Sequence, residues 1–341
     1  DIALSSVIVK GNAEASGSYA GGLAGQYVSG VSGANLSGTI KANSGATALG
    51  GSGIYSSSIK VNGSTITGGT DDKFLSDINT LNTGLDTYLG GDNDNDGYYF
   101  DYDKNNNIVI RSVVDYPLTF DLEEDNGVYL ISNYSDLRKA SLDPTKSYKL
   151  TDNIDLAGKK LYMLGNSNTA YTGTFDGNNK TISNISFTAD SGGLFKTLGT
   201  NGTIKNLKID GSDIEGNEKV GTLVGSTTAS QTLIENIKAT NLKVVGSGNN
   251  IGGLVGYHYA NNNRNKVIKA VEINGLNVEG AGNVGGMIGF AGGHISTCII
   301  DTGEDGLVKA NGNYVAIGIG HANDIALSSV IVKGNAEASG S

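Results

Sequence analysis

A short segment that recurs about every 30 residues constrains the fold of this chain more than any other feature. Five copies of this segment occur in the second half of the chain, and they begin at Ile204, Ile234, Ile268, Ile295 and Ile325. The first, fourth and sixth residues of each copy are small or aliphatic. A glycine-rich element lies between the copies, with the sequences GTLVG, GGLVG, GGMIG and AIGIG. Near the N-terminus, GGLAG at 21–25 followed by Val31, Ala34 and Leu36 continues the series.

A unit of this length that holds only short strands cannot bury its apolar face alone, so neighbouring units must stack. We therefore expect an all-β fold, a right-handed β-helix (β-solenoid) with coils of about 30 residues. The paired glycines let the backbone turn tightly, or take a positive φ where a Cβ would clash. Turn chemistry follows the strands at Asn62-Gly63, Asp210-Gly211 and Asn274-Gly275.

A second, much longer repeat links the two ends of the sequence. Residues 1–18, DIALSSVIVKGNAEASGS, reappear unchanged as residues 324–341, so the pattern has a period of 323 positions. Such identity indicates a tandem array of near-identical copies, or a fibre whose units join head to tail. An artificial duplication is the alternative.

Composition excludes several classes of protein. The chain has 52 Gly but 2 Pro, so it is not collagen-like, and its single Cys rules out an internal disulfide. Of the net charge of −10, the segment from Gly69 to Val128 carries −11 (14 Asp and Glu against 3 Lys and Arg), which leaves about +1 elsewhere. No basic stripe exists to bind nucleic acid, and no run of 18 apolar residues spans a membrane in this fragment. Because the sequence starts within the repeat pattern, the absence of a signal peptide says little about location.

The isolated cysteine and histidines do not form a reactive site in this interpretation. Cys298 occupies the slot held by Leu207, Ile237 and Val271 in other coils, so we expect a small core residue. The three histidines are His258, His294 and His321. They lie two, five and one residues, respectively, after the last Gly of the preceding glycine-rich element. They share no register, so we expect exposed turn residues and no stacked metal site.

The acidic segment breaks the solenoid pattern. Helical spacing of apolar residues over 71–89, ended by Gly90-Gly91, predicts an amphipathic helix that caps a sheet end. The residues that follow have the spacing of a calcium-binding loop that starts at Asp92. The oxygen ligands at its positions 1, 3, 5, 7 and 12 would come from Asp92, Asp94, Asp96, Tyr98 (by its backbone carbonyl) and Asp103. Asp replaces the usual Glu at position 12, and a β-ribbon is expected to follow. We predict a structural Ca²⁺ site; an Asx-rich hairpin turn without metal is the alternative.

The segments from about Val128 onward resemble bacterial surface proteins that carry the short Gly-Leu-rich "GLUG" motif. They occur in the order of that family: YKLTDNIDL from Tyr148, GTFDGNNKTISNI from Gly173, GGLF from Gly192, then coils of the GGLVG type. Residues 69–125, with Tyr116-Pro117, resemble the closing element of such proteins. The resemblance implies adhesins, surface-layer-like proteins and non-catalytic regions of secreted proteases, located outside the bacterial cell or on its surface.

In that family order the closing element would follow the coils, but here it precedes the opening segment. We therefore expect three parts: residues 1–69 as the C-terminal coils of one solenoid copy, residues 70–126 as an acidic cap or junction, and residues 127–341 as the N-terminal part of the next copy. The expected partners are identical copies along a fibre.

The predicted function is a structural repeat module of a long extracellular fibre or adhesin stalk, not an enzyme. No HExxH, GxSxG or phosphate-loop motif is present. One alternative is a solenoid that recognises glycans or host proteins, which the turn aromatics Tyr257, Tyr259 and Tyr314 would support. A polysaccharide-active β-helix enzyme is the other, since carboxylates from distant coils could still meet.

Overall fold

The structure is a computed structural model of the 341-residue chain. It describes residues 120–339, apart from residues 167, 229–230, 260–265 and 313, together with the backbone of the strands before residue 120. The chain divides into two compact units, Asp1–Asp115 and Tyr116–Ser341. The predicted helix over 71–89 lies outside the described residues, and the predicted boundaries after residues 69 and 126 stay predictions.

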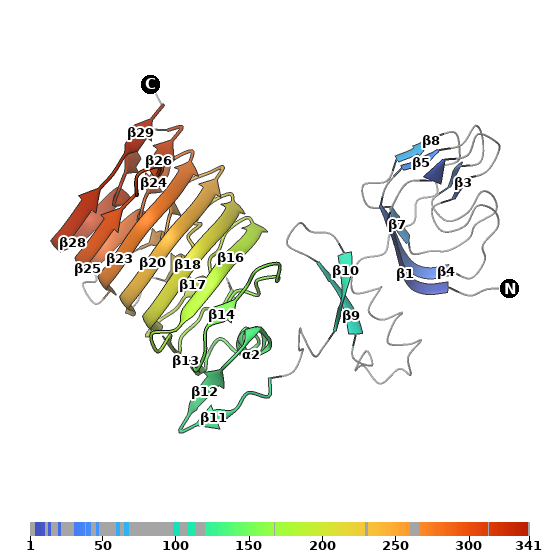
Figure 1. The fold of residues 1–341 in the computed structure, drawn as a ribbon, viewed down its shortest axis with the longest axis horizontal. Coiled ribbons are helices and arrows are strands. Elements are labelled where there is room, and N and C mark those ends of the chain that lie inside the picture. Colours follow the sequence, from blue (N-terminus) through green and yellow to red (C-terminus); the bar gives the residue numbers. More distant parts are fainter. Residues whose placement is uncertain are drawn as a thin grey trace. The chain divides into compact units, whose positions relative to one another are not determined.

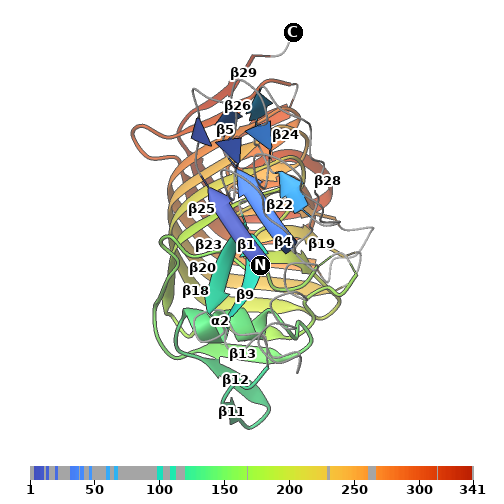
Figure 2. The same cartoon turned by 90° about the vertical axis from the view of Figure 1, so that its right-hand side faces the viewer.

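The second unit is a β-solenoid of about six turns, with coils of about 30 residues, as the short repeat predicts (Figure 1). Its coils run from β12 to β28, and the same stack is seen along another direction in Figure 2. Apart from the antiparallel pair β11–β12, the strand pairs among the described residues of this unit are parallel. No helix of the described residues is long and apolar enough to cross a membrane.

The strands of this unit vary in length from short rungs to bent strands of 15 residues. Their bounds are β11 (Glu124–Asp125), β12 (Val128–Ile131), β13 (Ser147–Leu150), β14 (Ile154–Asp155), β15 (Thr174–Asp176), β16 (Thr181–Ala189), β17 (Phe195–Leu198), β18 (Thr203–Gly216), β19 (Val224–Thr227), β20 (Thr232–Gly246), β21 (Ile251–Gly252), β22 (Val255–His258), β23 (Lys266–Gly280), β24 (Asn283–Gly285), β25 (Ile288–Asp301), β26 (Leu307–Ala310), β27 (Tyr314–Ala316), β28 (Ile319–Lys333) and β29 (Ala336–Ala338).

The long strands stack in the register that the short repeat predicts, with one correction at the end. Ile204 pairs with Ile234, Ile234 with Ile268, and Ile268 with Ile295. In the last coil, however, Ile295 pairs with Leu327 and not with Ile325. A bulge between Ala291 and Gly293 adds one residue to the offset, and the pairing before the bulge is already one residue beyond the predicted spacing of 30, so Ile295 pairs two positions later than predicted. Because side chains alternate with a period of two, a shift of two keeps the inward residues inward.

The long strands bend at residues whose backbone is left-handed. At the first bend φ lies between 53° and 56°, in the ladder Asn206, Asn236, Ala270, Thr297 and Ser329. Two of these side chains also bond to each other, since Asn236 Nδ2 donates to Asn206 Oδ1 at 2.8 Å. At the second bend, Gly211 and Gly275 have φ of 83° and 79°, which confirms their predicted turn role.

The glycine-rich elements are explained by close approach of coils, not by positive φ. A Cβ on Gly253 would collide with the carbonyl oxygen of Gly286, and one on Gly286 would collide with that of Ile317. Neither glycine has a positive φ. Successive coils can therefore stack at this point only where a side chain is absent.

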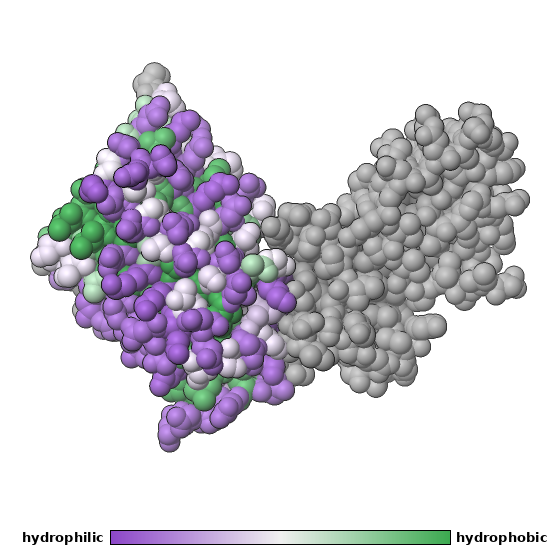
Figure 3. All heavy atoms as spheres, in the orientation of Figure 1, coloured by the Kyte–Doolittle hydropathy of each residue, from purple (hydrophilic) through white to green (hydrophobic). Residues whose placement is uncertain are grey.

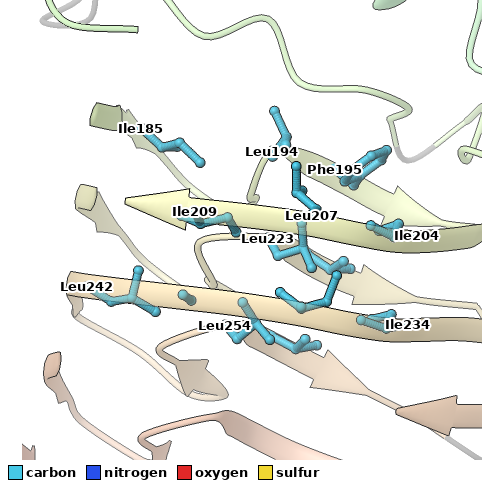
Figure 4. Packing of buried hydrophobic residues seen from close by; sticks show 14 of the residues in the cluster. Ile185, Leu194, Phe195, Ile204, Leu207, Ile209, Leu223, Ile234, Leu242 and Leu254 are labelled. Atoms are coloured by element: carbon cyan, nitrogen blue, oxygen red, sulfur yellow. The ribbon is translucent and has the colours of Figure 1, made fainter. Parts of the chain in front are cut away.

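The interior of the solenoid is a continuous aliphatic ladder. Leu194, Leu223 and Leu254 are fully buried and lie above one another in successive coils, beside the buried pair Ile204 and Ile234 (Figure 4). Burying each such side chain stabilises the fold by about 1.5–3 kcal/mol relative to leaving it in water. Because each coil covers the next, a coil at an open end leaves half of its contacts unmade.

A short helix, α2 (Tyr134–Ala140), lies near the first coils and was missed in the sequence. Its N-cap Asn133 accepts a hydrogen bond from the amide of Asp136 at 3.0 Å. The carboxylate of Asp136 accepts in return from the amide and the hydroxyl of Ser132, at 3.0 and 2.7 Å. This reciprocal cap is a helix-start signal. Leu137 and Ala140 are buried against the first coils.

The first unit contains a smaller set of parallel ladders and one hairpin. β1 (Leu4–Lys10), β4 (Val31–Ser37) and β7 (Ile59–Val61) form one ladder, as the N-terminal copy of the repeat predicts. The second ladder is β2 (Ala13–Glu14), β5 (Thr39–Lys41) and β8 (Thr65–Thr67), and β3 (Ala20–Gly21) pairs with β6 (Ala46–Thr47). β9 (Tyr98–Tyr102) and β10 (Ile108–Ser112) are antiparallel.

Candidate functional site: the open end of the solenoid

The last long strand, β28, carries core-type residues that are exposed. Leu327 is 54% and Val332 51% exposed, whereas their partners Ile295 and Ile300 in β25 are buried. Within the described part of the chain, β25 is the strand that pairs with β28. A hydrophobic area accordingly lies at the edge of the molecule over β28 (Figure 3). An edge strand with free backbone groups and apolar side chains is a template for another strand.

The sequence of this edge strand occurs twice, and the two occurrences have different neighbours. In β28 it pairs with the coil before it, for example Leu327 with Ile295. In β1 the same residues, 323 positions earlier, pair with the coil after it, for example Leu4 with Val31. Both registers skip the residue at the first bend, Ser329 in β28 and its counterpart Ser6 in β1.

The two pairings therefore combine into one continuous ladder. Three inward-facing positions of β28 each gain a neighbour on both sides when the two pairings are combined. Written as the residue in β25, the residue in β28 with its equivalent in β1, and the residue in β4, the three series are Ile295, Leu327 (Leu4) and Val31; Cys298, Val330 (Val7) and Ala34; and Ile300, Val332 (Val9) and Leu36. Each series places a small or aliphatic residue at every rung. The coil that follows β1 thus has the residue types that would cover the exposed face of β28.

Charged residues beside this core follow the same composite register. Lys333 donates to the Asp301 carboxylate at 2.9 Å, and Lys309 lies 3.9 Å from Glu279. Glu337 pairs in register with Lys309, and the equivalent Glu14 pairs with Lys41. The outer ladder therefore alternates in sign, as Glu279, Lys309, Glu337 (Glu14) and Lys41. Exposed pairs of this kind add little stability, but like charges in a shifted register would repel.

The predicted calcium ligands lie outside the described residues. Asp92, Asp94, Asp96 and Asp103 are not described, and Tyr98 begins β9, of which the backbone alone is described. The β-ribbon expected after them is confirmed by the β9–β10 hairpin, in which Tyr98 pairs with Ser112. Among the described residues, no group of three or more His, Cys, Asp or Glu side chains is placed to hold a metal ion.

Cys298 is a core residue, as its slot in the repeat predicts. It is buried, pairs with Val271 and Val330, and continues the ladder of Leu207 and Ile237. Burial raises the pKa of its thiol above the usual value. A protonated, enclosed thiol is a poor nucleophile.

The prediction that the three histidines are exposed turn residues is wrong. His258 lies in β22 and is fully buried, His294 lies in β25 and His321 in β28, both half-buried. Their separation in register is confirmed, because they pair with Ala291, with Val267 and with Phe290 respectively. Alternation along the strand would have placed His258 outward, three residues after the inward Val255, so the hydrophobic pattern gave no signal for its burial.

His258 belongs to a buried polar cluster that the sequence did not reveal. Lys266, also buried, donates from Nζ to Thr227 Oγ1 at 3.0 Å and to the carbonyls of Thr228 and Tyr259. Nδ1 of His258 lies 3.4 Å from the same Thr227 hydroxyl. Burial, with the nearby Lys266 charge second, lowers the pKa of His258 to about 3, and burial lowers that of Lys266 to about 8. The cluster joins the ends of β19 and β22, and no carboxylate takes part in these hydrogen bonds of His258 and Lys266.

The three turn aromatics singled out in the sequence, Tyr257, Tyr259 and Tyr314, belong to one group of rings in the structure. Rings from three coils form one chain of contacts, which we call the aromatic strip: Tyr259, Tyr257, Phe290, His321 and Tyr314. The first four are half-buried, and Tyr314 is 52% exposed. Tyr257, Phe290 and His321 are register partners, one from each of the three coils. Tyr259 and Tyr314 are additional rings beside Tyr257 and His321.

The fold defines the second unit as a β-solenoid, and the comparison with solved structures agrees with this class. No protein-family model matches the chain. Halomucin of Haloquadratum walsbyi is 35% identical over 143 residues, which are 38% of this chain and 2% of halomucin. A crystal structure described as a "putative immunoglobulin A1 protease" from Bacteroides ovatus superposes with a TM-score of 0.51 at 21% identity. It covers 63% of this chain and 75% of that one, and shows the fold alone.

Proposed function

We propose that this chain is a structural repeat module of a long extracellular solenoid, in which copies follow one another with a period of 323 positions. The observation that carries the proposal is the composite ladder at the edge strand. One sequence pairs with the preceding coil through Ile295 and with the following coil through Val31. A strand that has compatible neighbours on both sides is an interior coil of a longer stack.

In this arrangement the solenoid begins near residue 127, runs to residue 323 and continues with the sequence of residues 1–69. The exposed Leu327 and Val332 then become core residues, covered by the equivalents of Val31 and Leu36. The acidic segment over 70–126 ends one solenoid and precedes the next. The result is a series of rigid rods joined by acidic junctions.

We place this solenoid outside the cell or on its surface, where a stalk or filament would act. The resemblance of the segments from Val128 onward to bacterial surface proteins supports this placement, and the match to 2% of halomucin supports a place within a far longer protein. The chain itself supplies rigidity and length, and we propose no catalytic role for it. Its partners would be identical copies of itself.

A structural calcium site at the acidic junction is part of the proposal. The spacing of Asp92, Asp94 and Asp96 before Gly97 fits a calcium loop, and the hairpin that starts at Tyr98 would hold the end of that loop. Bound Ca²⁺ would neutralise part of the acidic charge and stiffen the junction. It would take no part in a reaction.

The mass of the intact native protein on a denaturing gel tests the proposal. A tandem array predicts a band several times larger than one repeat unit. A band near one unit would contradict the tandem array and would leave assembly from separate subunits. Mass under native conditions, measured on the same sample by light scattering, then shows whether such subunits associate.

A further inference from the structure

We infer that the aromatic strip binds an extended, uncharged polysaccharide along the side of the solenoid. The strip is a chain of partly exposed rings whose centroids lie 5.8, 5.0, 5.0 and 5.1 Å apart from one contact to the next. Three of its rings come from successive coils in one register, Tyr257, Phe290 and His321. This function is separate from the fibre role, since it needs neither the open end nor the junction.

The register continues below the rings as a line of hydroxyl groups. Ser226 is the partner of Tyr257, and Thr197 is the partner of Ser226. Their hydroxyl oxygens lie 3.4 Å apart. This outward-facing ladder therefore contains, over five successive coils, Thr197, Ser226, Tyr257, Phe290 and His321. Tyr257, Phe290 and His321 stack on one another with interplanar angles of 28° and 8°, so a sugar would contact their outer edges and the half-exposed ring of Tyr314. Aromatic groups in line with hydroxyls that can bond to sugar hydroxyls are a lining expected of a carbohydrate site.

This ladder is uncharged, whereas other outward ladders of the same coils are charged. One of those contains Glu235 and Lys269, paired at 2.9 Å, and another contains Lys238 and Glu272, also at 2.9 Å. The Lys219 ammonium lies 5.8 Å from the centre of the Tyr257 ring, but it is paired with Glu218 at 3.2 Å. The strip thus offers no net charge, and on a chain of net charge −10 it suits a neutral polymer better than an anionic one.

The shape of the strip favours a linear polymer over a globular protein. It follows the solenoid axis over three coils and is one or two rings wide, and the centroids of its register partners lie 5.0 Å apart. A protein partner would need a broad patch of about 800 Å² on each side. A sugar chain lying along the axis can instead meet a new ring or hydroxyl at each coil.

Affinity electrophoresis of the full chain tests this inference. Native gels would contain hydroxyethyl cellulose, dextran or mixed-linkage β-glucan, with alginate as the anionic counterpart. We expect retardation in at least one neutral gel, and about tenfold weaker binding for Phe290→Ala and for Tyr314→Ala. Tyr314→Ala is the safer variant for folding, because its ring is 52% exposed.

The matched control is the double variant Lys238→Ala with Glu272→Ala, which removes a paired charge from another outer ladder. It should be retarded as the wild type is. Circular dichroism and thermal melting of each variant show whether the solenoid is intact. The inference is overturned if the wild type migrates freely in all three neutral gels, if it is retarded in alginate alone, or if folded Tyr314→Ala and Phe290→Ala bind as the wild type does.

Discussion

Cys298 in β25 and Val330 in β28 are register partners, the fourth and fifth rungs of a core ladder that starts at Leu207. Cys298 is buried because β28 covers it. Val330 would be covered by the next coil, and its equivalent Val7 does have a partner on that side, Ala34. The burial of each rung thus depends on the coil that follows it.

The thiol of Cys298 should be unreactive in the native state. We expect 5,5′-dithiobis(2-nitrobenzoic acid) to modify it slowly in buffer and at once in guanidinium chloride, because burial raises its pKa and blocks access. Cys298→Val should be tolerated, since Val271 fills the same slot one coil earlier. Rapid modification of folded protein would contradict the burial of this rung.

Ala270→Gly should stabilise the solenoid. Ala270 has φ of 53°, a left-handed conformation that costs a residue with a Cβ about 1–2 kcal/mol and that glycine adopts freely. After the entropic cost of glycine, we expect a gain of up to about 1 kcal/mol in the free energy of unfolding. Ala189→Gly in β16, where φ is not left-handed, is the control and should lower that free energy. Equal effects of both changes on urea denaturation would contradict the strained bend.

Acid should destabilise the protein partly through His258. In the unfolded chain its pKa returns to about 6.5, whereas burial holds it near 3 in the folded state. Between these values the unfolded state binds a proton that the folded state does not, so stability falls as pH falls from 6.5 toward 3. At pH 5 this amounts to about 2 kcal/mol.

The variant His258→Gln has no group at this position that titrates between pH 3 and pH 7. Its loss of stability in acid is therefore compared with that of the wild type. Denaturant unfolding at pH 7 and pH 5 should show a smaller loss of stability for the variant than for the wild type. The carboxylates are unchanged between the two proteins, so their contribution cancels. The same loss in both would mean that His258 is protonated in the folded state.

Asp92→Ala combined with Asp96→Ala should abolish calcium binding in a calorimetric titration of the chain. Both carboxylates belong to the proposed loop, at its first and fifth positions. Asp152→Ala with Asp190→Ala makes the matched change in charge on described residues outside that loop. An unchanged titration after the first double change would reject the site.

Much of the fold could be predicted because a given position of the repeat has the same surroundings in every coil. The aliphatic positions of Ile204 and Leu207 recur with a fixed offset, so their stacking and the burial of Cys298 followed from sequence alone. The register of the last coil could not be predicted, because this coil has one residue more than the repeat before the bulge near Gly293 and one more at the bulge, a total of two, which leaves the same side chains facing inward. The bends at Asn206 were also missed, since the same slot is filled by Ala, Thr and Ser in later coils.

Surface features were harder to predict, because they depend on register between residues of different types. Tyr257, Phe290 and His321 share no residue type, yet the coil stack aligns them. His258 differs from them by one position and faces inward, where Lys266 and Thr227 meet it. Hydrophobic periodicity gives no weight to such residues, so both the aromatic strip and the polar cluster emerged from the structure.

Hydrogen exchange of β28 tests the central claim most directly. Residues 127–341 would be compared with the same chain extended by residues 19–69, which supplies the coil that follows β1 in the sequence. If β28 is an interior strand, the amides over 327–333 should exchange slowly in the extended chain, comparably to β25, and much faster without the extension. Equal exchange rates in the two chains would contradict the composite ladder and the continuous solenoid built on it.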